Sequence, residues 1–288
     1  MYFHNITPLH KMIVRNLKQT HPGDVVNCLV VAFENYYVKV STDHDYWINR
    51  WKAARVDYSM SAGVFDGQKL VGFILHGIDT DEGGVLSAFN CGTGILPAYR
   101  KRGFVQELYQ FLFPVLKEGG VQKCGLEVIT QNDIAFQSYE RVGFKTVKKY
   151  RCFFGQLEPT GAMGTGLSFT KTAKPDWEGY AQMQRCNFSW EHNDKALKAA
   201  GDDAFAYWEL FDGPQLSGYA VLKPNGHIVQ FGTVTDAYLH PLFDGIAGIT
   251  PQVRIVNIEE SAENTCEFLL SRGLKNSIDQ YYMECAIR

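Results

Sequence analysis

A short basic turn in the first half of the chain has the residue types needed to bind a phosphate group. Residues 95–105 read Ile-Leu-Pro-Ala-Tyr-Arg-Lys-Arg-Gly-Phe-Val. Apolar residues recur at helical spacing from Phe104 to Leu116, so the turn is expected to open a helix. The first N–H groups of a helix lack acceptors and carry partial positive charge, which suits a pyrophosphate beside Arg100–Arg102. Gly103 lets a ligand approach the backbone because it has no Cβ.

A second segment with a distinct residue pattern follows the strand expected at Cys124–Ile129. Asn132 is placed to cap a helix, because its side chain can accept a hydrogen bond from the first turn. That helix contains Tyr139 and is expected to stop at Gly143-Phe144. The two segments therefore share one layout, in which a strand leads through a polar turn into a helix.

Both segments resemble motifs of the GCN5-related N-acetyltransferases, the GNAT superfamily. Arg100-x-x-Gly103 resembles the acetyl-CoA loop, Gln/Arg-x-x-Gly-x-Gly/Ala, although Val105 stands where the family has Gly or Ala. The run from Asn132 through Ala135, Tyr139 and Glu140 to Gly143-Phe144 resembles the second block, in the right order and spacing. The resemblance covers about residues 11–155. It implies an α+β chain with the GNAT (acyl-CoA N-acyltransferase) fold, a mixed central sheet flanked by helices.

The resemblance also implies an activity, the transfer of an acetyl group from acetyl-CoA to an amine by direct attack in a ternary complex. Tyr139 matches the tyrosine that gives the leaving thiolate a proton or hydrogen bond; a core tyrosine with a satisfied hydroxyl is the alternative. Backbone N–H groups near the end of the Val85–Ile95 strand are expected to bind the thioester carbonyl. Asn132 is either a plain cap or a cap that also touches the pantetheine arm. The residues expected to bind acetyl-CoA, without a metal, are Ile95, Leu96, Arg100, Lys101, Arg102, Gly103, Phe104, Val105 and Asn132.

The general base and the acceptor stay open. A lysine-like amine has a pKa near about 10.4, so a carboxylate or a water chain must remove its proton before attack. The strand before the basic turn offers Ser87, Asn90 and Thr93 but no carboxylate. Aromatic residues between 33 and 51 could line an acceptor pocket, although core packing explains most of them. An amino acid, polyamine, aminosugar or peptide N-terminus would fit. The candidate bases are Glu34, Asp45, Asp57 and Glu127.

The second half of the chain echoes the first. A hairpin is expected at Gly218–Val234, then a strand, then a helix at Ser261–Ser271. At an offset of 130 residues, Gly143-Phe144 falls on Gly273-Leu274 and Tyr139 falls on a leucine. We therefore expect two copies of the fold in tandem. Their bounds are 1–155 for the copy with the acetyl-CoA site, 156–168 for a linker, and 169–288 for a degenerate copy.

Three local features limit these expectations. The run Gln215-x-x-Gly218-x-Ala220 matches the loop pattern literally, but it opens a hairpin and offers no helix start for a phosphate. The interval 232–251 is expected to be too short and turn-rich for a full cofactor helix. Pro114 is expected to kink the helix that begins at Phe104, or to end it near Phe113.

Composition excludes several classes of protein. The chain has 288 residues, 45% hydrophobic content and a net charge of −3, which gives no electrostatic case for nucleic acid. No apolar run is long enough for a membrane span, and the N-terminus lacks the layout of a signal peptide. Seven cysteines without a Cys-x-x-Cys argue against a disulfide framework or a zinc site and favour a reducing cytoplasm.

The expected partners are acetyl-CoA and a small amine acceptor, and a homodimer is left open. The competing class is a non-catalytic CoA-binding or protein-interaction module derived from an acetyltransferase. Val105, the strand without a carboxylate and the degenerate second copy favour that alternative.

Overall fold

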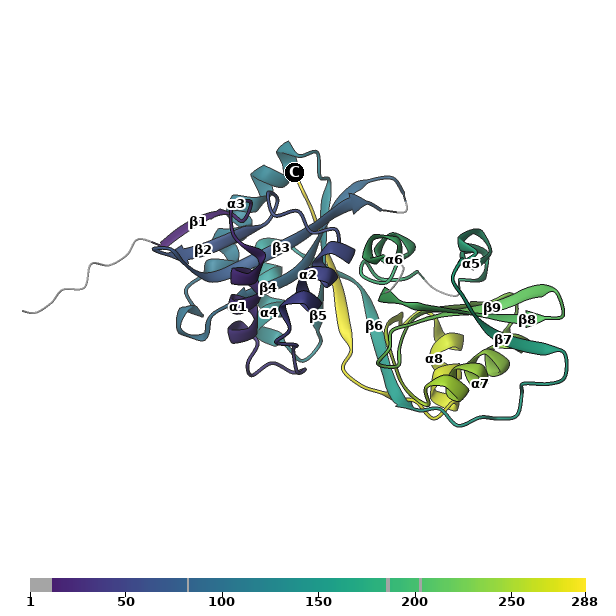
Figure 1. Cartoon of the computed structure of the whole chain (residues 1–288). Helices are drawn as coiled ribbons and strands as arrows, with labels where there is room; N and C mark the ends of the chain where they lie inside the picture. The colour runs from purple at the N-terminus through teal and green to yellow at the C-terminus, as the bar shows by residue number, and fades with distance from the viewer. Residues whose placement is uncertain (1–11, 82, 185–186, 202–203) are drawn as a thin grey trace, which may run out of the picture. The chain divides into compact units, whose positions relative to one another are not determined.

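The structure, a computed structural model, describes residues 12–81, 83–184, 187–201 and 204–288 (Figure 1). Its contacts divide the chain into two compact units, and the division is interleaved along the sequence. The first unit runs to Leu126 and adds residues 137–145 and 284–288. The second unit contains residues 127–136 and 146–283. The boundaries expected at 155 and 169 stay a prediction; residues 157–166 form neither helix nor strand.

The first unit is built on a mixed sheet. Its first four strands follow one another in antiparallel order, and β5 then joins β4 in parallel. Helix α3 makes the crossover that a parallel pair requires. The strands are β1 (Met12–Asn16), β2 (Ala62–Asp66), β3 (Lys69–Thr80), β4 (Leu86–Ile95) and β5 (Lys123–Ile129).

Helices pack on this sheet through one apolar face each. The face of α3 buries Leu108, Leu112 and Leu116. Pro114 lies inside α3, so the expected early end near Phe113 is wrong. Burial on both sides of the proline outweighs the backbone hydrogen bond that the proline removes. The helices are α1 (Pro22–Ala32), α2 (His44–Ala53), α3 (Phe104–Glu118) and α4 (Asp133–Val142), with the short 3-10 turn η1 (Pro97–Tyr99) before α3.

The second unit repeats this strand pattern. Strands β7, β8, β9 and β10 are antiparallel in order, β11 joins β10 in parallel, and β6 pairs with β11. Two copies of one α+β fold in tandem are thereby confirmed. The strands are β6 (Lys145–Gln156), β7 (Leu167–Thr172), β8 (Ala206–Asp212), β9 (Gln215–Leu222), β10 (His227–Thr233), β11 (Gln252–Glu259), β12 (Lys275–Asn276) and β13 (Gln280–Ala286).

Helices cover both faces of the sheet in the second unit, with α5 and α6 on one side and α7 and α8 on the other (Figure 1). The interval 232–251, expected to be too short and turn-rich for a full cofactor helix, contains the eleven-residue helix α7. Seven of its eleven residues are buried, and Pro241 lies in its first turn, where a missing N–H costs little. The helices are α5 (Trp177–Met183), α6 (Asp194–Ala200), α7 (Leu239–Ile249) and α8 (Glu263–Ser271), with the 3-10 turn η3 (Asp236–Tyr238) before α7.

Candidate active site

The basic turn lies between β4 and α3 in the first unit. Gly103 caps the helix with a φ of 81°, and Lys101 has a φ of 60°. Left-handed backbone at a residue with a side chain costs about 1–3 kcal/mol, so other contacts must hold Lys101 in place. Leu96 and Phe104 are buried and anchor the two ends of the turn, while Ile95 and Val105 are half-buried.

The two arginines of the turn bind the protein backbone. Arg100 donates from Nη2 to the carbonyl of Ala32 at 2.6 Å and from Nε to the carbonyl of Ile95 at 3.1 Å. Arg102 donates to the carbonyl of Ala98 at 2.9 Å. Lys101 is exposed and forms no ion pair within the described residues. The arginines therefore shape the turn in advance, and Lys101 is the side chain left to meet an anion.

The start of α3 supplies backbone donors. The N–H groups of Gln106 and Glu107 bond to the carbonyl of Gly103. The N–H groups of Gly103, Phe104 and Val105 have no acceptor within the part of the chain that the structure describes. Together with the positive end of the helix dipole, these groups can bind a phosphate.

Strand β4 has a bare edge that leads to this turn. It pairs with β5 over Ser87–Asn90 and then continues to Ile95 without a strand on that side, among the described residues. A register shift against β3 leaves Cys91 as the extra residue of a β-bulge. A strand edge without a neighbouring strand can bind an extended ligand through its backbone. The edge therefore forms a track between the bulge and the basic turn.

Tyr139 lies on α4, and its ring packs against Tyr109 and Phe144. Burial raises the pKa of Tyr139 to about 12, and hydrogen bonding from Thr93 and Asn90 opposes part of that rise. The hydroxyl is therefore protonated at neutral pH, and it lies close to Thr93 and Asn90 of β4. The position of Tyr139 agrees both with a core tyrosine and with a donor to the leaving thiolate. The ring packs in the core, and the protonated hydroxyl can still donate a hydrogen bond.

Asn132 caps α4 as expected, since its Oδ1 accepts the N–H of Ala135 at 3.2 Å. It belongs to residues 127–136 of the second unit, and its contact with a ligand stays a prediction. The candidate bases remain unassigned. Glu34 and Asp45 are exposed, and Asp57 accepts both the N–H and the O–H of Ser59 within a turn. Glu127 accepts a hydrogen bond from Asn257 at 2.7 Å.

The sequence does not predict one polar contact of the site, the hydrogen bonds from the Asn90 side chain to Thr93 and Tyr109. In the sequence, Asn90 is only one of the polar residues of a strand that contains no carboxylate. A polar residue that interrupts the apolar part of a central strand is the signal that could have found it.

Comparison with known proteins identifies the family. Residues 27–144 match the model of the Acetyltransferase (GNAT) family, and this range contains the basic turn and Tyr139. Residues 27–144 therefore form a domain of the GNAT acetyltransferase family. The N-alpha-acetyltransferase 30 of Schizosaccharomyces pombe is 28% identical over 109 residues, which cover 38% of this chain and 69% of that protein.

Solved structures extend the GNAT likeness to the whole chain. A putative acetyltransferase from Pyrococcus horikoshii has a TM-score of 0.70 and 14% identity, covering 100% of this chain and 93% of its own. A tandem GNAT protein from the clavulanic acid biosynthesis pathway has a TM-score of 0.69 and 10% identity, covering 96% of this chain and 99% of its own. Identities this low show the fold alone, and that fold is a tandem GNAT.

The second GNAT copy differs at the place that corresponds to the basic turn. Residues 234–238, between β10 and α7, read Val-Thr-Asp-Ala-Tyr and contain an acid but no Lys or Arg. The edge of β10 that continues beyond its pairing with β11 is occupied, because Gln184 forms a β-bridge with Gly232 there. Gln230 further donates to the carbonyl of His192 at 2.7 Å. The run Gln215–Ala220 lies in strand β9, so it has no helix start for a phosphate.

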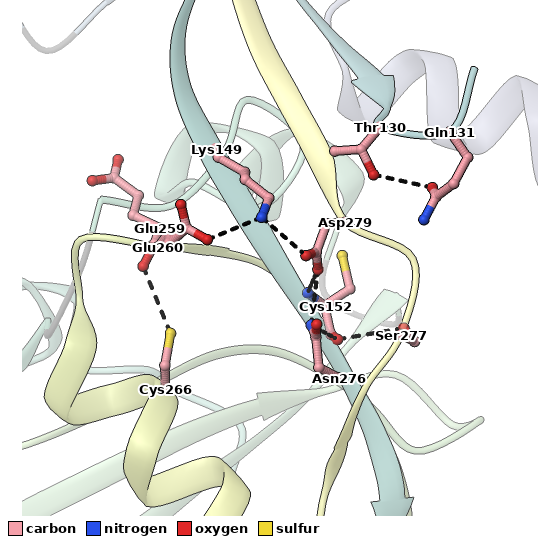
Figure 2. Close-up of polar contacts among 10 residues, drawn as sticks. All are labelled: Thr130, Gln131, Lys149, Cys152, Glu259, Glu260, Cys266, Asn276, Ser277 and Asp279. Atoms are coloured by element: carbon pink, nitrogen blue, oxygen red, sulfur yellow. Dashed lines mark hydrogen bonds and ion pairs between the residues drawn. The ribbon is translucent and has the colours of Figure 1, made fainter. Parts of the chain in front are cut away.

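Figure 2 shows a polar cluster in the second GNAT copy that has a structural role. Asp279 accepts hydrogen bonds from the N–H of Cys152 and the side chain of Asn276, and it pairs with Lys149 at 3.5 Å. Lys149 also pairs with Glu260 at 3.0 Å. Burial raises the pKa of the Cys152 thiol to about 11, so this thiol is a poor nucleophile. The cluster fixes the chain between β12 and β13 against β6.

Within the described residues, no group of three or more His, Cys, Asp or Glu side chains is arranged to hold a metal ion. Across the same residues, no helix is both long and apolar enough to cross a membrane.

Proposed function

We propose that the first GNAT copy transfers the acetyl group of acetyl-CoA to an amine by direct attack in a ternary complex. The observation that carries this proposal is the bare edge of β4, which runs from the bulge at Cys91 to the basic turn. One end of this track meets the N–H groups at the start of α3, which suit a pyrophosphate, and Thr93 along the track lies close to the side chain of Tyr139. A thioester on an extended pantetheine arm fits such a track.

Each part of the site takes one task in this proposal. The N–H groups of Gly103–Val105 and the ammonium of Lys101 bind the pyrophosphate, and the edge of β4 pairs with the pantetheine amides. The amine nitrogen attacks the thioester carbonyl carbon, and the developing oxyanion accepts hydrogen bonds from backbone N–H groups near the end of β4. The carbon–sulfur bond then breaks, and the thiolate takes the proton of Tyr139. Water or an unassigned base takes the amine proton, and solvent reprotonates Tyr139.

The name of one relative and the pKa of α-amines together suggest which amine acceptor to test first. The S. pombe relative is named as an N-alpha-acetyltransferase, which makes a peptide with a free N-terminus the first acceptor to test. An α-amine has a pKa near about 8, so a useful fraction is neutral at physiological pH. Polyamines, amino acids and aminosugars are the other candidates.

A panel assay tests the proposal. The whole protein is incubated with acetyl-CoA and peptides, polyamines, amino acids or aminosugars, and free thiol release is followed together with the mass of the product. We expect thiol release that depends on one class of amine and matches the acetylated product. Binding of acetyl-CoA without transfer to any amine would favour the non-catalytic module instead.

A further inference from the structure

We propose that a cavity in the first unit, apart from the expected acetyl-CoA site, binds a free α-amino acid with an apolar side chain. The cavity is lined by helix α1, strand β1 and the β2–β3 hairpin, and its volume is about 560 Å³. Sites for small ligands have volumes of about 300–1,000 Å³. Of the residues expected to bind acetyl-CoA, only Leu96 also lines this cavity. The inference does not depend on the proposed acetyl transfer.

One part of the cavity lining is apolar. Phe65 of β2, Leu70 of β3 and Leu96 after β4 are 3%, 8% and 7% exposed. Cys28 of α1 also lines the cavity, and burial raises the pKa of its thiol to about 12. The thiol is therefore neutral and a poor nucleophile. This lining can hold an apolar side chain and offers it no activated nucleophile.

Two cations line the cavity from the strands. The guanidinium carbon of Arg15, on β1, lies 4.0 Å from the centre of the Phe65 ring, so this cation sits over the apolar lining. Lys69 is the first residue of β3. Neither side chain forms an ion pair within the described residues. A guanidinium over an aromatic ring can still donate two hydrogen bonds from its edge to a carboxylate.

An acid lines the same cavity from the helix. Asp24 lies in the first turn of α1 and is exposed. No nitrogen of Arg15 or Lys69 lies within 4.0 Å of its carboxylate, so the opposite charges face one cavity without pairing with each other. A zwitterion can satisfy both signs, with its carboxylate at the strand side and its ammonium at the helix side.

The other polar residues of the lining leave this charge pattern unchanged. His21 caps α1, and its Nδ1 accepts the N–H of Gly23 at 3.1 Å. Gln19, Asn27 and Gln68 contribute uncharged amides. An apolar carboxylate without an amine would leave the acid unused, and an apolar amine would leave both cations unused. An α-amino acid uses all three charges and places its side chain on the apolar lining.

Calorimetric titration with matched probes tests the chemistry of the site. L-Phenylalanine and L-leucine carry both charges, 3-phenylpropanoate lacks the ammonium, and 2-phenylethylamine lacks the carboxylate. We expect one amino acid per chain and at least about tenfold weaker binding of either singly charged probe, because each charged hydrogen bond contributes to affinity. The absence of saturable binding of both amino acids would overturn the proposal. Equal affinity for L-phenylalanine and either singly charged probe would do the same.

Substitutions locate the bound amino acid. Arg15→Gln and Lys69→Gln remove the partners of the carboxylate, and Asp24→Asn removes the partner of the ammonium. The matched control is Lys18→Gln, at an exposed lysine that does not line the cavity. We expect each of the first three changes to weaken L-phenylalanine binding about tenfold and the control to leave it unchanged. Wild-type affinity in all three cavity variants would place the amino acid elsewhere and overturn the proposal.

A competition arm separates this cavity from the acetyl-CoA site. L-Phenylalanine is titrated into the whole protein in the presence of excess CoA, so that no acetyl transfer can occur. We expect one L-phenylalanine still to bind per chain. Loss of that binding would assign the cavity to the CoA site and overturn the proposal. Because the readout is binding alone, a protein that acetylates no amine would still show this site.

Discussion

The hydroxyl of Tyr139 lies among aromatic rings and beside two polar side chains of β4. Burial raises its pKa to about 12, so it holds its proton far above neutral pH. A protonated phenol is a hydrogen-bond donor, which suits a developing thiolate better than it suits a neutral thioester sulfur. Such an interaction lowers the barrier without tightening the ground state.

The Tyr139→Phe variant isolates this donor. It keeps the ring between Tyr109 and Phe144 and removes the hydroxyl alone. We expect kcat to fall by about 10²–10⁴-fold, the range for a positioned acid–base group, with little change in acetyl-CoA affinity or melting temperature. Steady-state kinetics and thermal unfolding on the same samples check this. Normal turnover with a lower melting temperature would make Tyr139 a purely structural residue.

A second buried group makes stability depend on pH. His76 is fully buried; its Nδ1 lies 2.9 Å from the carbonyl of Met60, and its Nε2 lies 3.6 Å from the thiol of Cys124. The carbonyl requires a proton on Nδ1, so Nε2 is the acceptor. Burial lowers the pKa of His76 to about 4. The unfolded chain therefore takes up the proton first, and stability is lost as the pH falls from about 6.5 toward 4.

Urea unfolding at pH 7 and pH 5 measures this loss. The wild type should lose about 2 kcal/mol more over that interval than His76→Gln, at about 1.4 kcal/mol per pH unit below 6.5. The control is Asn225→Ala, which removes a turn hydrogen bond and no titratable group, so it should keep the pH dependence of the wild type. Equal pH dependence in wild type and His76→Gln would contradict the assignment.

At the residue scale, the sequence predicts those features of the site that depend only on neighbouring residues. The cap at Asn132 and the position of Tyr139 follow from a strand–turn–helix pattern. The hydrogen bond from Asn90 to Tyr109 does not, because the two residues come from different elements. Only the packing of α3 against the sheet brings those two side chains together.

At the scale of elements, β4, the basic turn and α3 follow from the sequence because each is set by neighbouring residues. Helix α7 did not, since Gly, Pro and His lower helix propensity and its apolar face gains stability only by packing. Two of its residues, Phe243 and Ile246, are fully buried in the core of the second unit. Tertiary packing therefore overrides the local preference at this position.

A substitution at Gly232 tests whether the segment at Gln184 pairs with the edge of β10. A Cβ added at Gly232 would lie 2.3 Å from the carbonyl oxygen of Met183, and a backbone atom cannot move aside cheaply. We expect Gly232→Val to destabilise the second unit by about 1–3 kcal/mol and to leave acetyl-CoA affinity unchanged. Melting temperature and calorimetry check both parts.

The matched control for this change is Gly248→Ala in the same unit, where an added Cβ meets nothing within 4 Å. Helix propensity predicts a neutral or slightly stabilising effect there. Wild-type stability in Gly232→Val would show that the segment around Gln184 does not occupy the strand edge.

At the scale of the whole molecule, the sequence echo predicts two copies but not their interleaving. The echo works because Gly143 and Gly273 end equivalent helices with positive φ in both copies. Residues 137–145 and 284–288 join the first unit through one helix, α4, and one strand, β13, that begin in the second. Pairing between distant segments leaves no local pattern, so this division could not be read from the sequence.

The central claim is that a tandem GNAT carries one acetyl-CoA site, at the basic turn of its first unit. Calorimetric titration with acetyl-CoA tests it on the wild type, on Gly103→Val and on Gly161→Val. Both glycines have positive φ, but Gly161 lies in the irregular segment between β6 and β7, so it controls for backbone strain alone. Charged hydrogen bonds contribute roughly 1.5–3 kcal/mol each, so disturbing the N–H groups at Gly103 should matter.

We expect one acetyl-CoA per chain in the wild type and in Gly161→Val, and at least about tenfold weaker binding in Gly103→Val, at about 1.4 kcal/mol per tenfold. Two equivalent sites per chain, or unchanged affinity in a folded Gly103→Val protein, would contradict the claim.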